Sequence, residues 1–233
     1  MSALARVCLF ILLFTPLVFW KDLMFYYVST KVHFFLLVSE LTIVFYLWAN
    51  WKNGQWWPRI TIIGKALLIF VGVAVVASLF GVDPLFSFWS DMNRSLGILM
   101  WLHFGAIFFL FNGLLKTPQD WVRFFVVSTA VALVVAFFHM LSYTNIEALI
   151  NEKSGSTFGN STVLGTYLLF QIFFSVFLIF AAKTRPVRAY AVFAFLVLSV
   201  SLWIVPAHAA RLSFFGGMLL LGSLLLVRLG ATR

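Results

Sequence analysis

The chain has few charged residues and almost no cysteine. Only 10% of its 233 residues are charged, against about 25% in soluble domains, and 63% are hydrophobic, with a mean hydropathy of +1.05. So much apolar surface excludes a water-soluble protein and indicates a polytopic α-helical membrane protein. The one cysteine, Cys8, excludes an intrachain disulfide, and no cluster has the spacing of metal ligands, so we expect no bound metal.

Motifs for nucleotide and hydrolytic chemistry are also missing. The sequence contains no P-loop, no dinucleotide-binding fingerprint, no GxSxG and no HExxH, and we expect no cofactor. The net charge of +9 does not indicate a nucleic-acid partner, because the basic residues stand in short loops between apolar runs, where they orient a membrane protein.

Eight apolar runs are present, and each would reach about 26–33 Å as a helix, enough to cross the hydrocarbon core. They cover residues 4–20, 32–49, 61–82, 95–115, 122–143, 162–182, 189–206 and 212–229. We therefore expect an all-α transmembrane bundle of about eight spans, forming a single domain over residues 1–233. Pro206 and Arg211 interrupt the last two runs, and a re-entrant pair is an alternative there.

The distribution of Lys and Arg predicts the orientation. With eight spans, eleven of these residues fall on the side of both termini and five on the other side. The positive-inside rule then places both termini in the cytoplasm. The apolar run that follows Arg6 has no small-residue cleavage site, so we interpret it as an uncleaved first span.

One polar, glycine-bearing passage stands out, from Lys153 to Tyr167, on the predicted outer side. Its glycines allow positive φ, and its side chains, Thr157 and Asn160 among them, can cap the helix that follows. Helix N-termini attract anions, phosphate included. The alternative is an ordinary connecting loop with a capped helix.

Two arginines begin apolar runs on the same predicted side, against the positive-inside trend. These are Arg94 and Arg211. A charge at membrane depth costs about 2.5–3.5 kcal/mol on insertion scales, and a guanidinium matches phosphate oxygens with two parallel donors. Together with Asn160 and Thr157 they would suit a lipid pyrophosphate; the alternative is that each arginine extends to the headgroups.

Two ionisable residues lie inside predicted spans at similar depth, Glu40 and His103. We predict that they form an intramembrane polar pair, because a carboxylate in a membrane needs a partner or a proton. A protonated Glu40 bonded to a neighbouring hydroxyl is an equal alternative. His208, three residues before Arg211, is a weak candidate for a catalytic proton carrier, and His139 is expected to be an interfacial hydrogen-bonding residue.

Three passages together resemble the O-antigen ligase / O-antigen polymerase family of bacterial membrane glycosyltransferases. Ser156-Thr-Phe-Gly-Asn-Ser-Thr-Val-Leu-Gly165 resembles the family's Gly-Thr-Phe-Gly-Asn-Pro-Asn-x-Leu-Ala passage. Asp83-Pro through Arg94-Ser-Leu-Gly97 resembles its Asp-Pro…Ser-x-Trp-Gly…Arg-x-x-Gly passage. His208-Ala-Ala-Arg-Leu-Ser-Phe-Phe-Gly216 resembles its Thr-x-Ser-Arg-Gly-Ala-x-x-Gly passage, and the order along the chain agrees.

The resemblance implies transfer of a glycan from undecaprenyl pyrophosphate to a lipid or protein acceptor, on the outer face of the bacterial inner membrane. Arg94 and Arg211 would then bind the pyrophosphate, beside Asn160 and Thr157. The family has about a dozen spans and a large outer loop with a histidine that serves as base, and this chain lacks both. We therefore expect the N-terminal portion of such an enzyme, with a second polypeptide that supplies the remaining spans as one alternative and a non-enzymatic lipid-linked-glycan binder or transport subunit as another.

Overall fold

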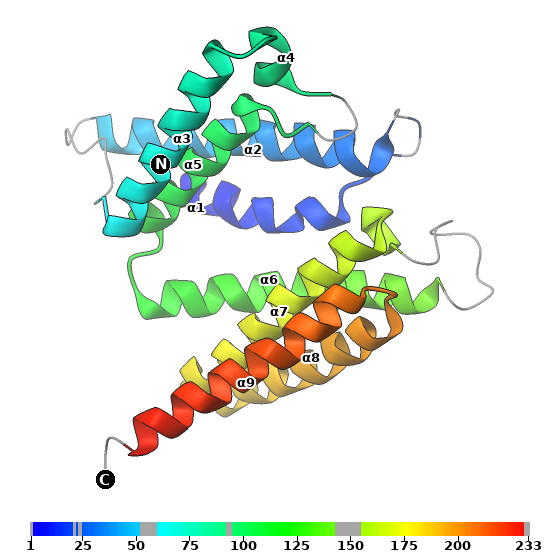
Figure 1. Cartoon of the computed structure of the whole chain (residues 1–233). Coiled ribbons are helices and arrows are strands. Elements are labelled where there is room, and N and C mark those ends of the chain that lie inside the picture. Colours follow the sequence, from blue (N-terminus) through cyan, green and yellow to red (C-terminus); the bar gives the residue numbers. More distant parts are fainter. Residues whose placement is uncertain are drawn as a thin grey trace. The chain divides into compact units, whose positions relative to one another are not determined.

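A computed structural model describes residues 2–20, 22, 25–51, 60–91, 95–142 and 155–230. Of these, residues 228–230 are described by their backbone only. Within these residues the chain is all-α (Figure 1), as predicted, with nine α-helices and two short 3₁₀ helices. In chain order they are α1 (Ser2–Ile11), η1 (Leu12–Leu17), α2 (Tyr26–Asn50), α3 (Ile62–Leu79), α4 (Pro84–Trp89), α5 (Ile98–Leu114), α6 (Pro118–Leu141), η3 (Ser156–Phe158), α7 (Ser161–Ala181), α8 (Arg185–Ile204) and α9 (His208–Gly230).

Six of the described helices are long and apolar enough to cross a membrane: α2, α3, α6, α7, α8 and α9. The protein is thus a multi-pass membrane protein by helix length and hydropathy. The other two predicted runs form shorter apolar helices, Ser2–Leu17 and Ile98–Leu114. The first continues as 3₁₀ structure around Pro16, and the second begins only after Gly97, which is its N-cap and has an extended conformation.

The end of the chain contains two full-length helices. α8 ends at Ile204 and α9 begins at His208, and both are long enough to span. The structure therefore favours two spans over a re-entrant pair. The cytoplasmic placement of the termini stays a prediction from charge.

Local capping explains several helix starts. The Thr61 hydroxyl accepts a hydrogen bond from the Gly64 N–H (3.1 Å) at the start of α3. At the start of α6, Asp120 Oδ2 accepts from the Thr117 N–H (3.0 Å), while Thr117 Oγ1 accepts from the Asp120 N–H (3.1 Å). This reciprocal pair is a capping box, which satisfies two backbone donors that the helix itself leaves without partners.

The chain divides into two compact units, residues 1–124 and 125–233. The sequence predicts that the two units together form a single membrane domain, and this stays a prediction. In the first unit, α1 packs along α2, and α5 packs on both α2 and α3. Ring contacts support these packings, between Phe35 and Phe104 (centroids 5.0 Å apart) and between Phe70 and Trp101 (5.4 Å).

In the second unit, α7 packs against both α8 and α9 (yellow, orange and red in Figure 1). One face of α7 is fully buried through Leu164, Leu168 and Ile172. The core also contains polar contacts between helices: the Ser128 hydroxyl donates to Gln171 Oε1 (3.0 Å), and the hydroxyls of Thr129 and Tyr190 are 3.0 Å apart. Buried polar groups need such partners, because water cannot reach them.

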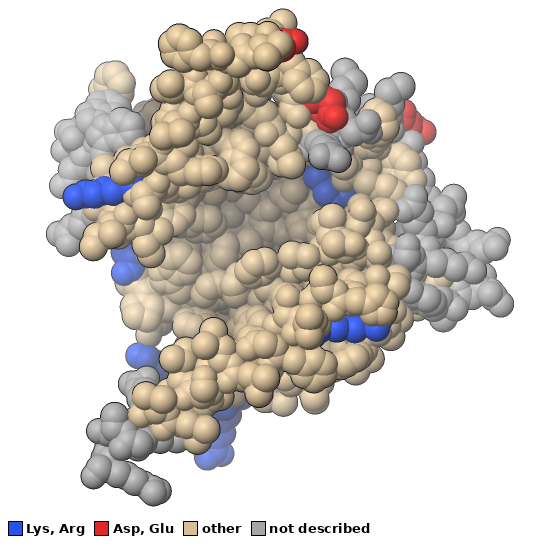
Figure 2. Space-filling model, in the orientation of Figure 1, with Lys and Arg blue, Asp and Glu red and all other residues tan. Residues whose placement is uncertain are grey.

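The surface agrees with a membrane environment. In Figure 2 uncharged residues cover most of the visible face, and few Lys, Arg, Asp or Glu side chains interrupt them. Large apolar side chains are exposed along α3 and α9. In the most apolar 18-residue stretch of these two helices, only 11% and 6% of the residues are buried inside the protein. Such faces suit contact with lipid rather than with water.

Candidate anion-binding site

The polar passage folds into a tight turn between residues 155 and 160. A Cβ placed on Gly155 would lie only 2.2 Å from the Asn160 nitrogen and 2.4 Å from the Gly159 carbonyl carbon. Gly159 has φ 64°, in the left-handed region. The two glycines are thus required for different reasons, one for close approach of the backbone and the other for its conformation.

Asn160 caps α7. Its Oδ1 accepts hydrogen bonds from the Thr162 N–H (2.8 Å) and the Val163 N–H (3.3 Å), and the residue is exposed. Thr157 is buried within η3, and the neighbouring Ser156 hydroxyl donates to the Val135 carbonyl of α6 (3.2 Å). This local geometry agrees with a connecting loop that is held against α6 and in which the exposed Asn160 caps the N-terminus of α7.

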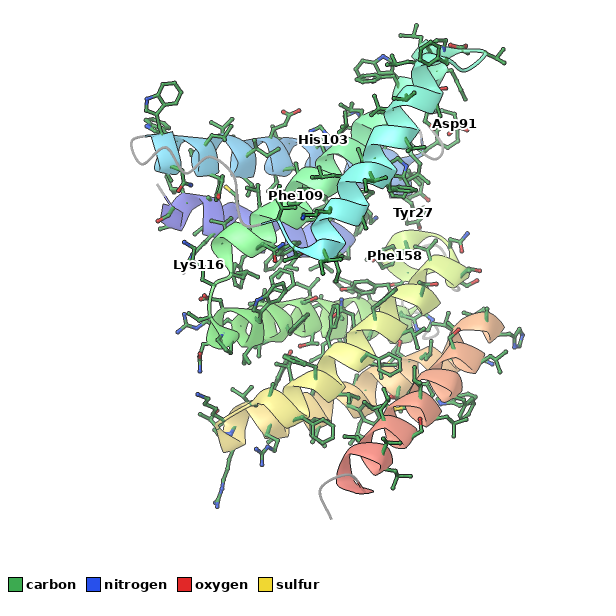
Figure 3. All side chains as sticks on the ribbon, turned by 60° about the vertical axis from the view of Figure 1, so that its left-hand side comes forward. Tyr27, Asp91, His103, Phe109, Lys116 and Phe158 are labelled. Carbon is green, nitrogen blue, oxygen red and sulfur yellow. The ribbon has the colours of Figure 1, made fainter. Side chains whose placement is uncertain are left out.

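Phe158 anchors the same turn on α7. Its ring contacts that of Tyr167, with centroids 5.0 Å apart (Figure 3). The turn is therefore attached both to α6, through Ser156, and to α7, through Phe158.

Arg211 closes the turn between α8 and α9. Its guanidinium donates from Nη2 to the Trp203 carbonyl (2.8 Å) and the Val205 carbonyl (2.5 Å), and from Nε to the Leu202 carbonyl (3.5 Å). It also lies over the Trp203 ring, 5.7 Å from the centroid. The charge therefore compensates the carbonyl end of α8, where a helix leaves acceptors without partners.

Gly165 brings these two passages to the same end of the second unit. A Cβ on Gly165 would lie 2.4 Å from Ala207 Cβ and 3.2 Å from Ala210 Cβ. Gly165 is one turn into α7, after Asn160, and the two alanines flank the start of α9. The Asn160 cap and the Arg211 turn thus share one end, at which the N-termini of two parallel helices, α7 and α9, also lie.

Arg94 lies outside the described residues, but the passage around it is well formed. Asp83 Oδ1 accepts from the Phe86 N–H (2.9 Å) and so caps α4, with Pro84 at its first position. A Cβ on Gly97 would lie 2.3 Å from the Phe88 carbonyl oxygen. The chain therefore folds back so that the start of α5 packs on the backbone of α4.

A groove of about 380 Å³ opens between α3, α4 and the start of α5. None of its lining residues is charged, and they include the aromatic residues Phe70, Phe86 and Trp101 and the serines Ser78, Ser87, Ser90. In sequence, Arg94 stands between Ser90 and Leu96, which both line this groove. The groove would suit an uncharged ligand group with both apolar and hydroxyl surfaces.

Glu40 and His103 lie together in the first unit. His103 of α5, labelled in Figure 3, has its Nε2 3.7 Å from Glu40 Oε1 of α2, and the Glu40 side chain is 63% exposed. His103 Nδ1 is 2.8 Å from the Leu99 carbonyl, which can only accept, so Nδ1 carries the proton. Nε2 is therefore the ring nitrogen that faces Glu40.

The pairing predicts energetic coupling between the two residues. The variants Glu40→Gln and His103→Ala, combined in a double-mutant cycle, are expected to show coupling of about 0.6 kcal/mol, typical of polar pairs in membrane proteins. Unfolding of the full chain by SDS in mixed micelles measures it. Additive effects of the two substitutions would show that the pair does not interact.

The remaining predicted histidines fall in different environments. His208 is exposed at the first position of α9, at the same end as Arg211. His139 was expected at the interface, but it is fully buried, and its Nδ1 is 3.2 Å from the Ser201 hydroxyl of α8. The physical reason is that this side of α6 faces α8, as the Ser201 contact shows. Gln171 was missed by sequence reasoning, although a lone amide in the middle of an apolar run is a signal for a buried partner.

No group of three His, Cys, Asp or Glu side chains in the described part of the chain could hold a metal ion. No family model, curated protein or solved structure matches this chain.

Proposed function

We propose that this chain is an O-antigen ligase-like glycosyltransferase, which binds a glycan linked to undecaprenyl pyrophosphate at the outer face of the bacterial inner membrane. The observation that carries the proposal is the Gly165 contact with Ala207 and Ala210. This contact brings the passage around Asn160 and the passage around Arg211 to one end of the second unit. The two passages are far apart in sequence, and both carry the family resemblance.

The chemistry of that end supports an anionic ligand. It combines a guanidinium, an exposed capping amide and the N-termini of α7 and α9, whose dipoles favour negative charge. Thr157 is proposed as part of the turn, and a pyrophosphate-binding role for Arg94 stays a prediction from sequence. The pyrophosphate would be held during transfer and stabilised as the leaving group, an electrostatic role. The exposed His208, at the first position of α9, is the candidate base for the acceptor hydroxyl.

The alternative function is a binder or transport subunit for the same lipid-linked glycan. The Glu40–His103 pair favours it, because a pair of ionisable side chains on two neighbouring apolar helices suits a path through the membrane. Glycan transfer by this chain, alone or with a second polypeptide that supplies further spans, distinguishes the enzyme from the binder.

The test of the proposal is binding of polyprenyl pyrophosphate to the full chain in nanodiscs. Arg211→Lys keeps a charge that can reach the α8 carbonyls but loses the forked donor pair, so we expect about 10-fold weaker binding. Arg94→Ala is expected to weaken binding by a similar factor.

Arg188 provides a matched control. Its Nη2 donates to the Ala182 carbonyl (3.2 Å) at the end of α7, so it caps a helix as Arg211 does, at the opposite end of the second unit. Arg188→Lys and Arg185→Ala should leave binding unchanged. Equal affinities for all four variants and the unsubstituted chain would contradict the site.

A further inference from the structure

We infer that His139 is a positioning residue for the Arg211 guanidinium, acting through the last turn of α8. His139 stands near the end of α6 and has no exposed surface. Its Nδ1 lies 3.2 Å from the hydroxyl of Ser201, which is also fully buried. Ser201 is three residues before the end of α8, so the contact joins α6 to the part of α8 that Arg211 caps.

A continuous set of hydrogen bonds leads from this contact to the guanidinium. The Ser201 carbonyl accepts from the Val205 N–H (3.0 Å), and the Val205 carbonyl accepts from Arg211 Nη2 (2.5 Å). The other two acceptors of Arg211, the carbonyls of Leu202 and Trp203, belong to the residues directly after Ser201. The direction of all three carbonyls therefore depends on the rotation of α8 about its axis at Ser201.

The His139–Ser201 contact restricts that rotation. A buried hydroxyl without a partner destabilises an apolar bundle, so α8 would turn or shift to bring the Ser201 hydroxyl to another partner. The same part of α6 also holds the polar turn, because Ser156 donates to the carbonyl of Val135, one helical turn before His139. The end of α6 thus supports both halves of the candidate anion site, and this role for binding depends on the proposed function.

The fold does not depend on His139 alone. Thr129 of α6 contacts Tyr190 near the start of α8 (3.0 Å), and Ser128 of α6 donates to Gln171 of α7 (3.0 Å). The Thr129–Tyr190 contact joins the same two helices as His139–Ser201, but it lies eleven residues earlier along α8. Thr129→Val is therefore a control that removes a hydroxyl contact far from Arg211, while Tyr190 keeps its hydrogen bond to the Val126 carbonyl of α6 (3.2 Å).

Trp203 provides a readout that needs no ligand, since the Arg211 guanidinium lies 5.7 Å from its ring centroid. The full chain is labelled with 5-fluorotryptophan, and the Trp203 ¹⁹F resonance is assigned by its absence in Trp203→Phe. His139→Leu is expected to shift this resonance, and His139→Asn, which places a polar atom where Nδ1 was, is expected to restore it. Thr129→Val should leave it unchanged.

Binding of polyprenyl pyrophosphate to the same variants measures the consequence for the site. We expect about 10-fold weaker binding for His139→Leu, recovery in His139→Asn, and no further loss when His139→Leu is added to Arg211→Lys. An unchanged Trp203 resonance in His139→Leu, or an equal shift in Thr129→Val, would overturn the inference. Absence of binding by the unsubstituted chain would instead contradict the proposed function, and the Trp203 resonance would still decide the role of His139.

Discussion

Gly165→Leu is expected to destabilise the protein by about 3 kcal/mol, because it adds a branched side chain to a contact that has no room for one. Even a Cβ at this position would lie 2.4 Å from Ala207 Cβ, and Gly165 is buried. The start of α9 would have to move away from α7. The Arg211 turn would move with it, so affinity for the lipid pyrophosphate should fall together with stability.

Gly216→Leu is the matched control. Gly216 is a helical glycine on α9, and a Cβ there would meet no atom within 4 Å. Its replacement should change stability by no more than about 0.5 kcal/mol, as surface substitutions usually do. SDS-induced unfolding, followed by circular dichroism, compares the two. Equal midpoints for Gly165→Leu and Gly216→Leu would show that the close contact of α7 with the α8–α9 turn does not exist.

Gly97→Ala is expected to cost about 2–3 kcal/mol, a large effect for a single methyl group. A Cβ at Gly97 would lie 2.3 Å from the Phe88 carbonyl oxygen and 2.8 Å from the Trp89 carbonyl carbon. These are backbone atoms, which cannot change rotamer, so α4 and the start of α5 would separate. The groove between α3, α4 and α5 would widen as a result.

Gly81→Ala tests whether the effect is specific to that contact. A Cβ on Gly81 would lie 3.4 Å from the nearest atom, the Ala77 carbonyl oxygen, at ordinary contact distance. We expect this variant to be as stable as the unsubstituted chain, or slightly more stable, because alanine restricts the unfolded chain more than glycine does. SDS-induced unfolding, followed by circular dichroism, compares Gly97→Ala with Gly81→Ala. A Gly97→Ala protein that unfolds at the same SDS fraction as Gly81→Ala would contradict the packing of α5 on α4.

Local sequence signals predicted several features of the site correctly. The Asn160 cap follows from an asparagine immediately before an apolar run, and its two backbone hydrogen bonds are present. The left-handed conformation of Gly159 follows from the residue type. Both depend on atoms within a few residues along the chain, and such interactions require no knowledge of the rest of the fold.

Contacts between side chains of different helices were harder to predict from the sequence. Glu40 and His103 could be matched by their depth in two spans, and the structure places them 3.7 Å apart. His139 was expected at an interface and is buried against Ser201, because its depth alone does not reveal which side of α6 faces α8. The rotation of a helix about its axis decides this, and in an apolar run with few polar residues the sequence carries little information about it.

The amino-acid sequence by itself determined that this is an all-α, multi-pass membrane protein, because spans of this length and hydropathy have no stable place in water and must satisfy their backbone hydrogen bonds internally. It also determined the capped turn before α7. Only the tertiary structure decided that Gly165 contacts the start of α9 and that the Arg211 guanidinium binds the α8 carbonyls. It also decided that His139 contacts Ser201 in the same part of α8. These contacts depend on helix rotation and crossing, which small residues permit by close approach and which no run of neighbouring residues specifies.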